Sequence, residues 1–216
     1  SHDGRAGEWL DDAFVITEDK RYYRHAGVDY IRVLGSIWAN IKAGGFAEGF
    51  STITMQLARN VFPEALTSEK TLIRKFREAK VARQIEARFS KERILELYLN
   101  QIAFGTGAFG VESAAQRYFG RPINEMTVAE GAMLAALPKA PSRYNPRRFP
   151  DRAIQRRNTV IELMRRENVL SDADASIAKA YPLRLFRPAR GGTGEIAPYF
   201  VEWVRTELVR RFGRQA

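Results

Sequence analysis

Residues 127–138 read Thr-Val-Ala-Glu-Gly-Ala-Met-Leu-Ala-Ala-Leu-Pro. Thr127 and Glu130 have the spacing of a capping box, in which each side chain accepts a hydrogen bond from a free backbone N–H group at the start of a helix. Pro138 ends the helix, because its ring cannot continue the helical hydrogen bonding. The side chains in between are small or apolar, so we expect a helix that other helices can approach closely.

The same periodic signal extends over most of the chain. Apolar residues recur about every 3.6 positions, as on one face of a helix, and alternating strand-like runs are short or missing. Gly105, Gly107 and Gly110 predict a turn and not a nucleotide loop, since no strand precedes them and their spacing fits neither nucleotide fingerprint. The sequence therefore predicts an all-α fold, with helices over residues 29–42, 52–61, 71–89, 91–99, 110–118, 128–137, 152–167 and 199–212.

Composition limits the partners and cofactors that this chain can have. The 216 residues are 45% hydrophobic, enough for one core and a small second lobe, and the formal net charge is +10. Such a charge favours an anionic partner, and nucleic acid, an anionic membrane surface and a diphosphate all qualify. The chain has no cysteine, which excludes disulfides and cysteine-bound metals. No run approaches the roughly 18 apolar residues of a membrane-spanning helix.

A dense mixture of charged and aromatic side chains occupies residues 18–27. It begins with Glu18 and Asp19 and contains His25, one of two histidines. A carboxylate that takes a proton from a sugar hydroxyl needs a fixed position and neighbours that adjust its pKa, so Glu18 and Asp19 are candidates for a general base. The alternative is a solvated, charge-mixed helix start in which His25 only packs.

Residues 49–60 have the features of an anion site at the start of a helix. Ser51 or Thr52 can cap the helix after Gly49, which leaves backbone N–H groups free to meet an anion. Gln56 and Arg59 then share one helix face, three positions apart. The alternative is a capped helix that serves only the core.

Residues 70–78 are strongly basic and contain one carboxylate. Arg74 and Lys75 lie one turn from Glu78, an arrangement that can bind phosphate and hold a carboxylate beside it. The alternative is an exposed face with ordinary intrahelical ion pairs. Residues 90–100 follow behind a Ser90 cap, and their apolar side chains mark a mostly buried helix that we assign to the scaffold.

Taken in order, these four segments resemble the signature motifs of the family 51 glycosyltransferases, the peptidoglycan polymerase domains of class A penicillin-binding proteins and their monofunctional relatives. The match runs from about residue 14 to residue 145, and residues 117–122 and 137–146 also resemble that family. Residues 197–204 resemble the passage that leads towards a transpeptidase domain. We therefore expect a glycosyltransferase domain over residues 1–196 and, over 197–216, the start of a linker towards a transpeptidase domain that this sequence does not contain.

The resemblance implies a lysozyme-like helical lobe and a smaller jaw lobe, about residues 43–70, that faces the membrane. Aromatic and aliphatic side chains at positions 46, 50, 61, 62 and 66 could expose an apolar surface there, and the alternative is that they close the core. Family members usually carry an N-terminal transmembrane anchor, which is not in this sequence. The expected location is the outer face of the bacterial cytoplasmic membrane.

The reaction that the resemblance implies is polymerisation of lipid II into glycan strands, with inversion and release of undecaprenyl diphosphate. A hydroxyl of the acceptor attacks the anomeric carbon of the lipid-linked donor, and Glu18 is the expected general base. Positive charge then stabilises the leaving diphosphate. Glu78 matches the second acidic residue of the family and is expected to act in catalysis, to orient cations or to hold a metal. The expected substrate-binding residues are Asp19, His25, Ser51, Thr52, Gln56, Arg59, Asn60, Lys70, Arg74 and Lys75.

The family also implies a set of partners and cofactors. Lipid II, the growing lipid-linked glycan, the membrane surface and inhibitors of the moenomycin type are expected ligands, and nucleic acid is not. Family members often work with magnesium or manganese; no metal-ligand cluster is visible in the sequence, so an ion would be shared with the diphosphate, with Glu78 as a candidate ligand. No organic cofactor is expected.

Four positions depart from the usual family pattern, and two rival functions remain. Tyr22 stands where phenylalanine is common, Phe50 where glycine is, Met55 where glutamine is, and Arg59 where lysine is. A lysozyme-like hydrolase or lytic transglycosylase would also use Glu18 but has no need of the basic cluster. A basic helical module that binds nucleic acid or membrane explains the charge but neither Glu18 nor Glu78.

Overall fold

The computed structural model describes residues 6–44, 49–63 and 72–187. These residues form α-helices and a single two-stranded sheet, which confirms the predicted all-α class. The helices are α1 (Ala6–Glu18), α2 (Tyr30–Lys42), α3 (Ile53–Val61), α4 (Leu72–Glu86), α5 (Lys91–Gln101), α6 (Val111–Phe119), α7 (Val128–Ala136), α8 (Pro150–Arg166) and α9 (Asp172–Ala180). Short 3-10 turns occupy Tyr22–Arg24 and Ile123–Glu125, and the strands are β1 (Ala103–Gly105) and β2 (Ala108–Phe109).

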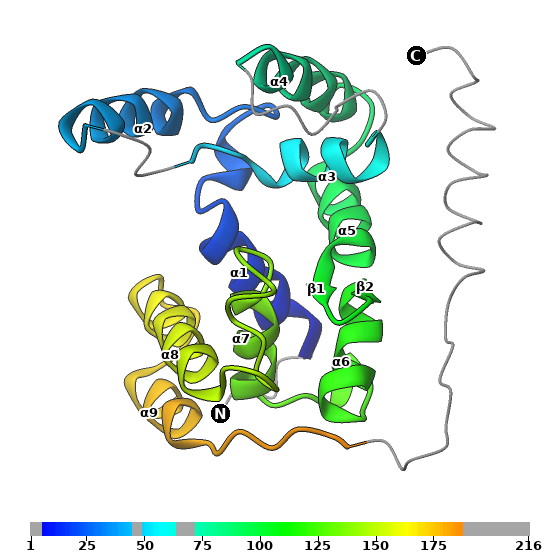
Figure 1. The fold of residues 1–216 in the computed structure, drawn as a ribbon, viewed down its shortest axis with the longest axis vertical. Coiled ribbons are helices and arrows are strands. Elements are labelled where there is room, and N and C mark those ends of the chain that lie inside the picture. Colours follow the sequence, from blue (N-terminus) through cyan, green and yellow to red (C-terminus); the bar gives the residue numbers. More distant parts are fainter. Residues whose placement is uncertain (1–5, 45–48, 64–71, 188–216) are drawn as a thin grey trace.

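Helix α7 lies at the centre of the larger lobe, with α1, α8, α9 and α6 around it (Figure 1). The predicted capping box is present, since the Thr127 hydroxyl accepts a hydrogen bond from the backbone N–H of Glu130 and the Glu130 carboxylate accepts one from that of Thr127. A Cβ atom on Gly131 would lie 2.2 Å from the ring of Trp9. The absence of a side chain at Gly131 therefore lets α1 pack closely against α7, as expected for a helix of small side chains.

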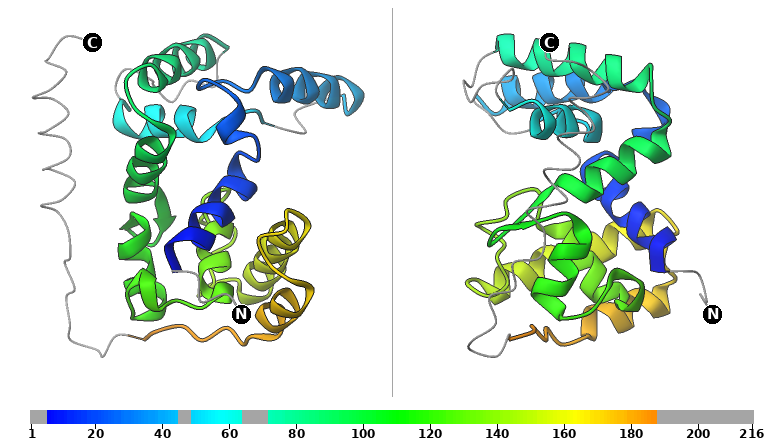
Figure 2. Two further views of the ribbon diagram at one scale, coloured as in Figure 1. Left: turned by 180° about the vertical axis from the view of Figure 1, so that it is seen from behind. Right: turned by 90° about the vertical axis from the view of Figure 1, so that its right-hand side faces the viewer.

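Helices α2, α3 and α4 form a smaller lobe at one end of the molecule (Figures 1 and 2). Val28, Met55 and Ala82 make its core, which is separate from the core of the larger lobe. Gly27 has a φ of +86°, and a Cβ atom there would lie 2.9 Å from the backbone of Ala82, so glycine lets the chain pass directly against α4. Met55 is fully buried in this core, and its apolar side chain suits that environment.

The smaller lobe extends on both sides of the predicted jaw region 43–70, because its core joins residues from before α2 to the C-terminal half of α4. Parts of that region, residues 45–48 and 64–70, lie outside the described residues. The same is true of the predicted helix 199–212 and linker 197–216.

Three elements differ from the sequence prediction. Helices α1 and α9 were not predicted, and α9 gives a weak pattern because its only buried side chains are two alanines, Ala175 and Ala178. The glycines near residue 107 do form a turn, but the turn joins two short antiparallel strands. Gly110 has a φ of +80°, and a Cβ atom there would lie 2.7 Å from the carbonyl oxygen of Asn100, so this hairpin closes tightly onto the end of α5.

Candidate active site

Glu18 is the last residue of α1 and lies half-buried where the two lobes meet. Its Oε2 atom accepts a hydrogen bond from Nε2 of Gln56, at 3.1 Å. Its Oε1 atom is buried and has no hydrogen-bond partner among the described residues. One oxygen is thus held by α3, and the other makes no hydrogen bond within the described residues.

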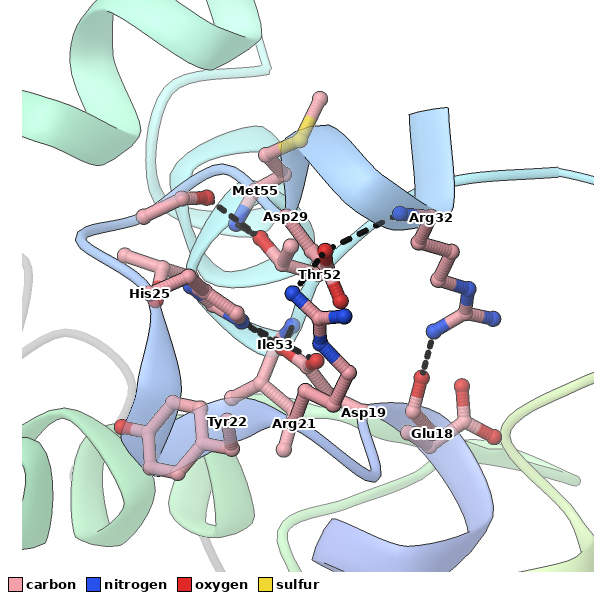
Figure 3. A network of polar contacts seen from close by, with 12 residues as sticks. Glu18, Asp19, Arg21, Tyr22, His25, Asp29, Arg32, Thr52, Ile53 and Met55 are labelled. Carbon is pink, nitrogen blue, oxygen red and sulfur yellow. Dashed lines mark hydrogen bonds and ion pairs between the residues drawn. The ribbon is translucent and has the colours of Figure 1, made fainter. Parts of the chain in front are cut away.

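The surroundings of Glu18 push its pKa in two directions. Burial is the largest effect and raises the pKa above the usual value of a glutamate, whereas the hydrogen bond from Gln56 and the positive charges of Arg156, Arg32 and Lys139 lower it. Arg32 also donates a hydrogen bond to the backbone carbonyl of Glu18, at 2.6 Å (Figure 3). These three cations were not among the residues predicted from the sequence, since they come from α2, α8 and the segment after α7.

Asp19, His25 and Thr52 belong to a network of polar contacts next to Glu18 (Figure 3). Asp19 is 0% exposed; it accepts hydrogen bonds from the backbone N–H of Ile53 and, at 3.0 Å, from the His25 ring. Thr52 is also fully buried, caps α3 through the N–H of Met55 and donates to the carbonyl of Gly27. The side-chain oxygens of Asp19 and Thr52 are used internally and position α3 relative to Glu18, whereas Nδ1 of His25 is buried without a hydrogen-bond partner among the described residues. The expected role of these three residues in binding substrate stays a prediction.

The second carboxylate, Glu78, gathers three cations from two helices. It is 0% exposed, and its oxygens lie 2.6 Å from Nζ of Lys75, 3.3 Å from Nε of Arg74 and 3.6 Å from a terminal nitrogen of Arg59. Arg59 is on α3 and the other two cations are on α4. The predicted one-turn pairing is therefore present, but as a partly buried cluster and not as an exposed helix face.

Lys75 connects this cluster to the loop before α3. Its Nζ atom donates a hydrogen bond to Oγ of Ser51, at 2.7 Å, and lies 5.8 Å from the centre of the Phe50 ring. Burial lowers the pKa of Lys75 below its usual value, while Glu78 opposes that shift. Ser51 and Lys75 thus present a hydroxyl and a desolvated ammonium group side by side, as an anion site requires. Asn60 is exposed in the last turn of α3, and Lys70 lies outside the described residues.

The geometry of Glu78 favours an organising role over the catalytic one that the sequence predicts. Its carboxylate is enclosed and already faces three positive groups. A divalent ion placed there would be repelled by the same cations, so this site does not fit a bound metal. The weak energy typical of exposed helical pairs does not apply to a carboxylate that is out of contact with water.

Tyr98 is a site residue that the sequence analysis assigned to the scaffold. It lies on α5, is fully buried, and its hydroxyl donates to Oε1 of Gln56 at 3.3 Å. A tyrosine among the aliphatic side chains of a buried helix face is a usable signal, because its hydroxyl needs a partner inside the protein.

The sequence is similar to a known protein family and to several curated proteins. Residues 4–165 match the family model described as transglycosylase. Penicillin-binding protein 1A of Haemophilus influenzae is 46% identical over 95% of this chain, which covers 24% of that protein. Penicillin-binding protein 1A of Aquifex aeolicus is 43% identical over 97% of this chain and 28% of its own length, and penicillin-binding protein 1F of Bacillus subtilis is 44% identical over 81% and 24%.

The chain thus spans about a quarter of the length of these curated relatives. A 2.6 Å crystal structure of penicillin-binding protein 1A from H. influenzae is 35% identical, with a TM-score of 0.46, and the match covers 74% of this chain and 20% of that one. The family model covers most of the chain and confirms what the order of the motifs predicts. This chain therefore belongs to the transglycosylase family, the family 51 glycosyltransferases.

Proposed function

We propose that this chain is a peptidoglycan glycosyltransferase that polymerises lipid II. The observation that carries the proposal is the arrangement on α3, where Gln56 holds a carboxylate with one free oxygen and Arg59, one turn further, joins a cluster of cations. A base and a group of cations side by side fit a reaction that removes a proton from a hydroxyl and expels a diphosphate. The match of residues 4–165 to the transglycosylase family model supports a glycosyl-transfer reaction.

In the proposed reaction, the free oxygen of Glu18 takes the proton of the acceptor hydroxyl as that oxygen attacks the anomeric carbon of the donor. The bond to the lipid diphosphate breaks on the opposite face, so the configuration inverts. Burial of Glu18 raises its pKa and makes its carboxylate a stronger base than one in water. The hydrogen bond from Gln56 keeps the carboxylate oriented.

The leaving diphosphate is the proposed ligand of the cluster around Glu78. Arg59, Arg74 and Lys75 supply positive charge, and the Ser51 hydroxyl supplies a hydrogen bond. Cations that are already in place stabilise the developing charge without having to reorganise during the reaction. No step is assigned to a divalent ion, because the surroundings of Glu78 do not fit one.

Incubation of the chain with labelled lipid II in detergent tests the proposal. We expect polymer to accumulate while purified glycan strands stay intact. Cleavage of those strands without consumption of lipid II would instead identify a lytic enzyme that uses the same carboxylate. Failure of both reactions, with binding that weakens steeply as salt is added, would identify a basic binding module.

We further propose that α2 contacts the outer surface of the cytoplasmic membrane. In the described residues, no helix is long and apolar enough to cross a bilayer. Helix α2 buries only Ser36, however, and exposes six large apolar side chains: Tyr30, Ile31, Leu34, Ile37, Trp38 and Ile41. It projects from the end of the molecule that carries the cation cluster (Figure 2). An apolar helix on a chain with a net charge of +10 suits an anionic lipid surface.

Leu34→Glu should weaken binding to vesicles of phosphatidylglycerol and phosphatidylethanolamine by about tenfold, since insertion of a leucine side chain contributes about 1.5–3 kcal/mol. The measurement is the bound fraction after sedimentation. Ile177→Glu is the matched control, because Ile177 on α9 has the same exposure, 68%, but lies on the other lobe. Equal losses in both variants would contradict a specific role of α2.

A further inference from the structure

The hydrogen bonds around Gln56 connect a buried tyrosine to the proposed base. Tyr98 on α5 donates to Oε1 of Gln56, and Nε2 of Gln56 donates to Oε2 of Glu18. These three residues come from α5, α3 and α1, and lie 42 and 38 positions apart along the chain. Such a connection depends on how three helices pack and on no local motif.

The hydroxyl of Tyr98 determines which group donates in each of these hydrogen bonds. Tyr98 is 0% exposed, and burial raises its pKa well above the usual value, so the hydroxyl keeps its proton. A hydroxyl that donates to the carbonyl oxygen of Gln56 leaves the NH₂ group of that amide facing Glu18. The amide therefore offers a donor to the carboxylate, and a donor stabilises the ionised form that a base requires.

We propose that Tyr98 is a positioning residue for glycosyl transfer, which acts through Gln56 to hold Oε2 of Glu18 and leave Oε1 as the oxygen that accepts the proton. The proposal rests on the proposed function and deepens it. It also gives Gln56 a task on the side of the base, where the sequence analysis expected it to bind substrate. Oε1 of Glu18 is the atom that the structure leaves buried and without a partner among the described residues.

Removal of the tyrosine hydroxyl tests this role without removing the ring. Tyr98→Phe should lower kcat/KM for lipid II about 3- to 10-fold, the effect of one lost hydrogen bond, with the loss in kcat and little change in KM. The acidic limb of the pH profile should also move to higher pH. Without its orienting partner Gln56 donates less well, the ionised form of Glu18 loses support, and the pKa of Glu18 rises.

Other charged groups near Glu18 do not confuse this comparison. Arg32 faces it from α2, Arg156 from α8 and Lys139 from the segment after α7, and Asp19 is its neighbour in the chain. All four are unchanged in Tyr98→Phe. A displaced acidic limb in that variant is therefore due to the lost hydroxyl.

Tyr118→Phe is the matched control, because Tyr118 is also fully buried and its hydroxyl donates to the carbonyl of Phe104, away from Glu18. Both variants should lose thermal stability to a similar extent. Only Tyr98→Phe should change kcat and the pH profile. Equal kinetic effects in the two variants would reduce Tyr98 to a core residue and overturn the proposal.

A double-mutant cycle decides whether Tyr98 acts through Gln56. Gln56→Met keeps the length of the side chain but removes both hydrogen bonds, and should lower kcat/KM at least as much as Tyr98→Phe. Adding Tyr98→Phe to it should then change the rate by less than about twofold, because the residue that transmits the effect is gone. Fully multiplied effects would overturn the proposal, whereas a wild-type chain that makes no polymer would overturn the proposed function itself.

Discussion

Glu18→Gln should lower the rate of lipid II polymerisation by about 100-fold or more, the usual contribution of a positioned general base. Glutamine keeps the size of the side chain and can still accept the hydrogen bond from Gln56, but it cannot take the proton of the acceptor hydroxyl. Binding of lipid II should therefore survive. Initial rates of polymer formation, measured beside a direct binding assay, check both parts.

Stability distinguishes this loss from a folding defect. Burial disfavours the charged form of Glu18, so the neutral glutamine should leave the thermal unfolding temperature unchanged or slightly higher. Glu96→Gln serves as the control, because Glu96 is exposed on α5 and pairs only with Arg93 among the described residues. That variant should polymerise at the wild-type rate. Near-normal turnover of Glu18→Gln would remove Glu18 from the role of base.

Glu78→Gln should reduce both stability and turnover, because it removes the one negative charge that three cations share. Loss of one partner from a buried ion pair costs about 3–5 kcal/mol, and the partial exposure of the cations together with the remaining amide lowers this to about 2–4 kcal/mol. The cations are then no longer held in place for the diphosphate, so the maximal rate should fall about 10- to 100-fold. Denaturant unfolding and steady-state rates across a lipid II series measure these effects.

The larger lobe provides a matched control for Glu78. Glu162 also receives three cations, Arg165, Arg166 and Lys179, but it is partly exposed and far along the chain from the proposed site. Glu162→Gln should cost clearly less stability and leave turnover unchanged. If Glu78→Gln kept wild-type stability and lost turnover, the carboxylate would be acting in the chemical step, as the sequence analysis first expected.

The contrast between the two proposed carboxylates follows from their surroundings. Glu18 has one free oxygen and a raised pKa, which favours proton transfer over stability. Glu78 also has an oxygen, Oε1, without a hydrogen bond among the described residues, but three cations lie within 3.6 Å of its carboxylate, which favours the ordering of other groups. Both glutamates match positions in the family motifs. Their proposed roles differ only because their burial and their contacts differ.

Much of the fold could be predicted from local signals. The capping box of Thr127 and Glu130, the Ser90 cap and the apolar periodicity each depend on residues within a few positions of one another, and the structure has the helices that they predict. The order of the motifs identified the family for the same reason. Helix α1 was missed, although it carries the proposed base at its last residue.

The sequence by itself determined most of the helices, the family and the residue types available for chemistry, because these depend on local spacing. The tertiary structure alone decided that Asp19 accepts a hydrogen bond from the first residue of α3, that Tyr98 reaches Gln56, and that the apolar side of α2 is exposed. Periodicity shows which side chains share a helix face, but it contains no information on whether that face meets water, lipid or another helix. That depends on contacts between residues more than 30 positions apart, which form only when the chain is packed.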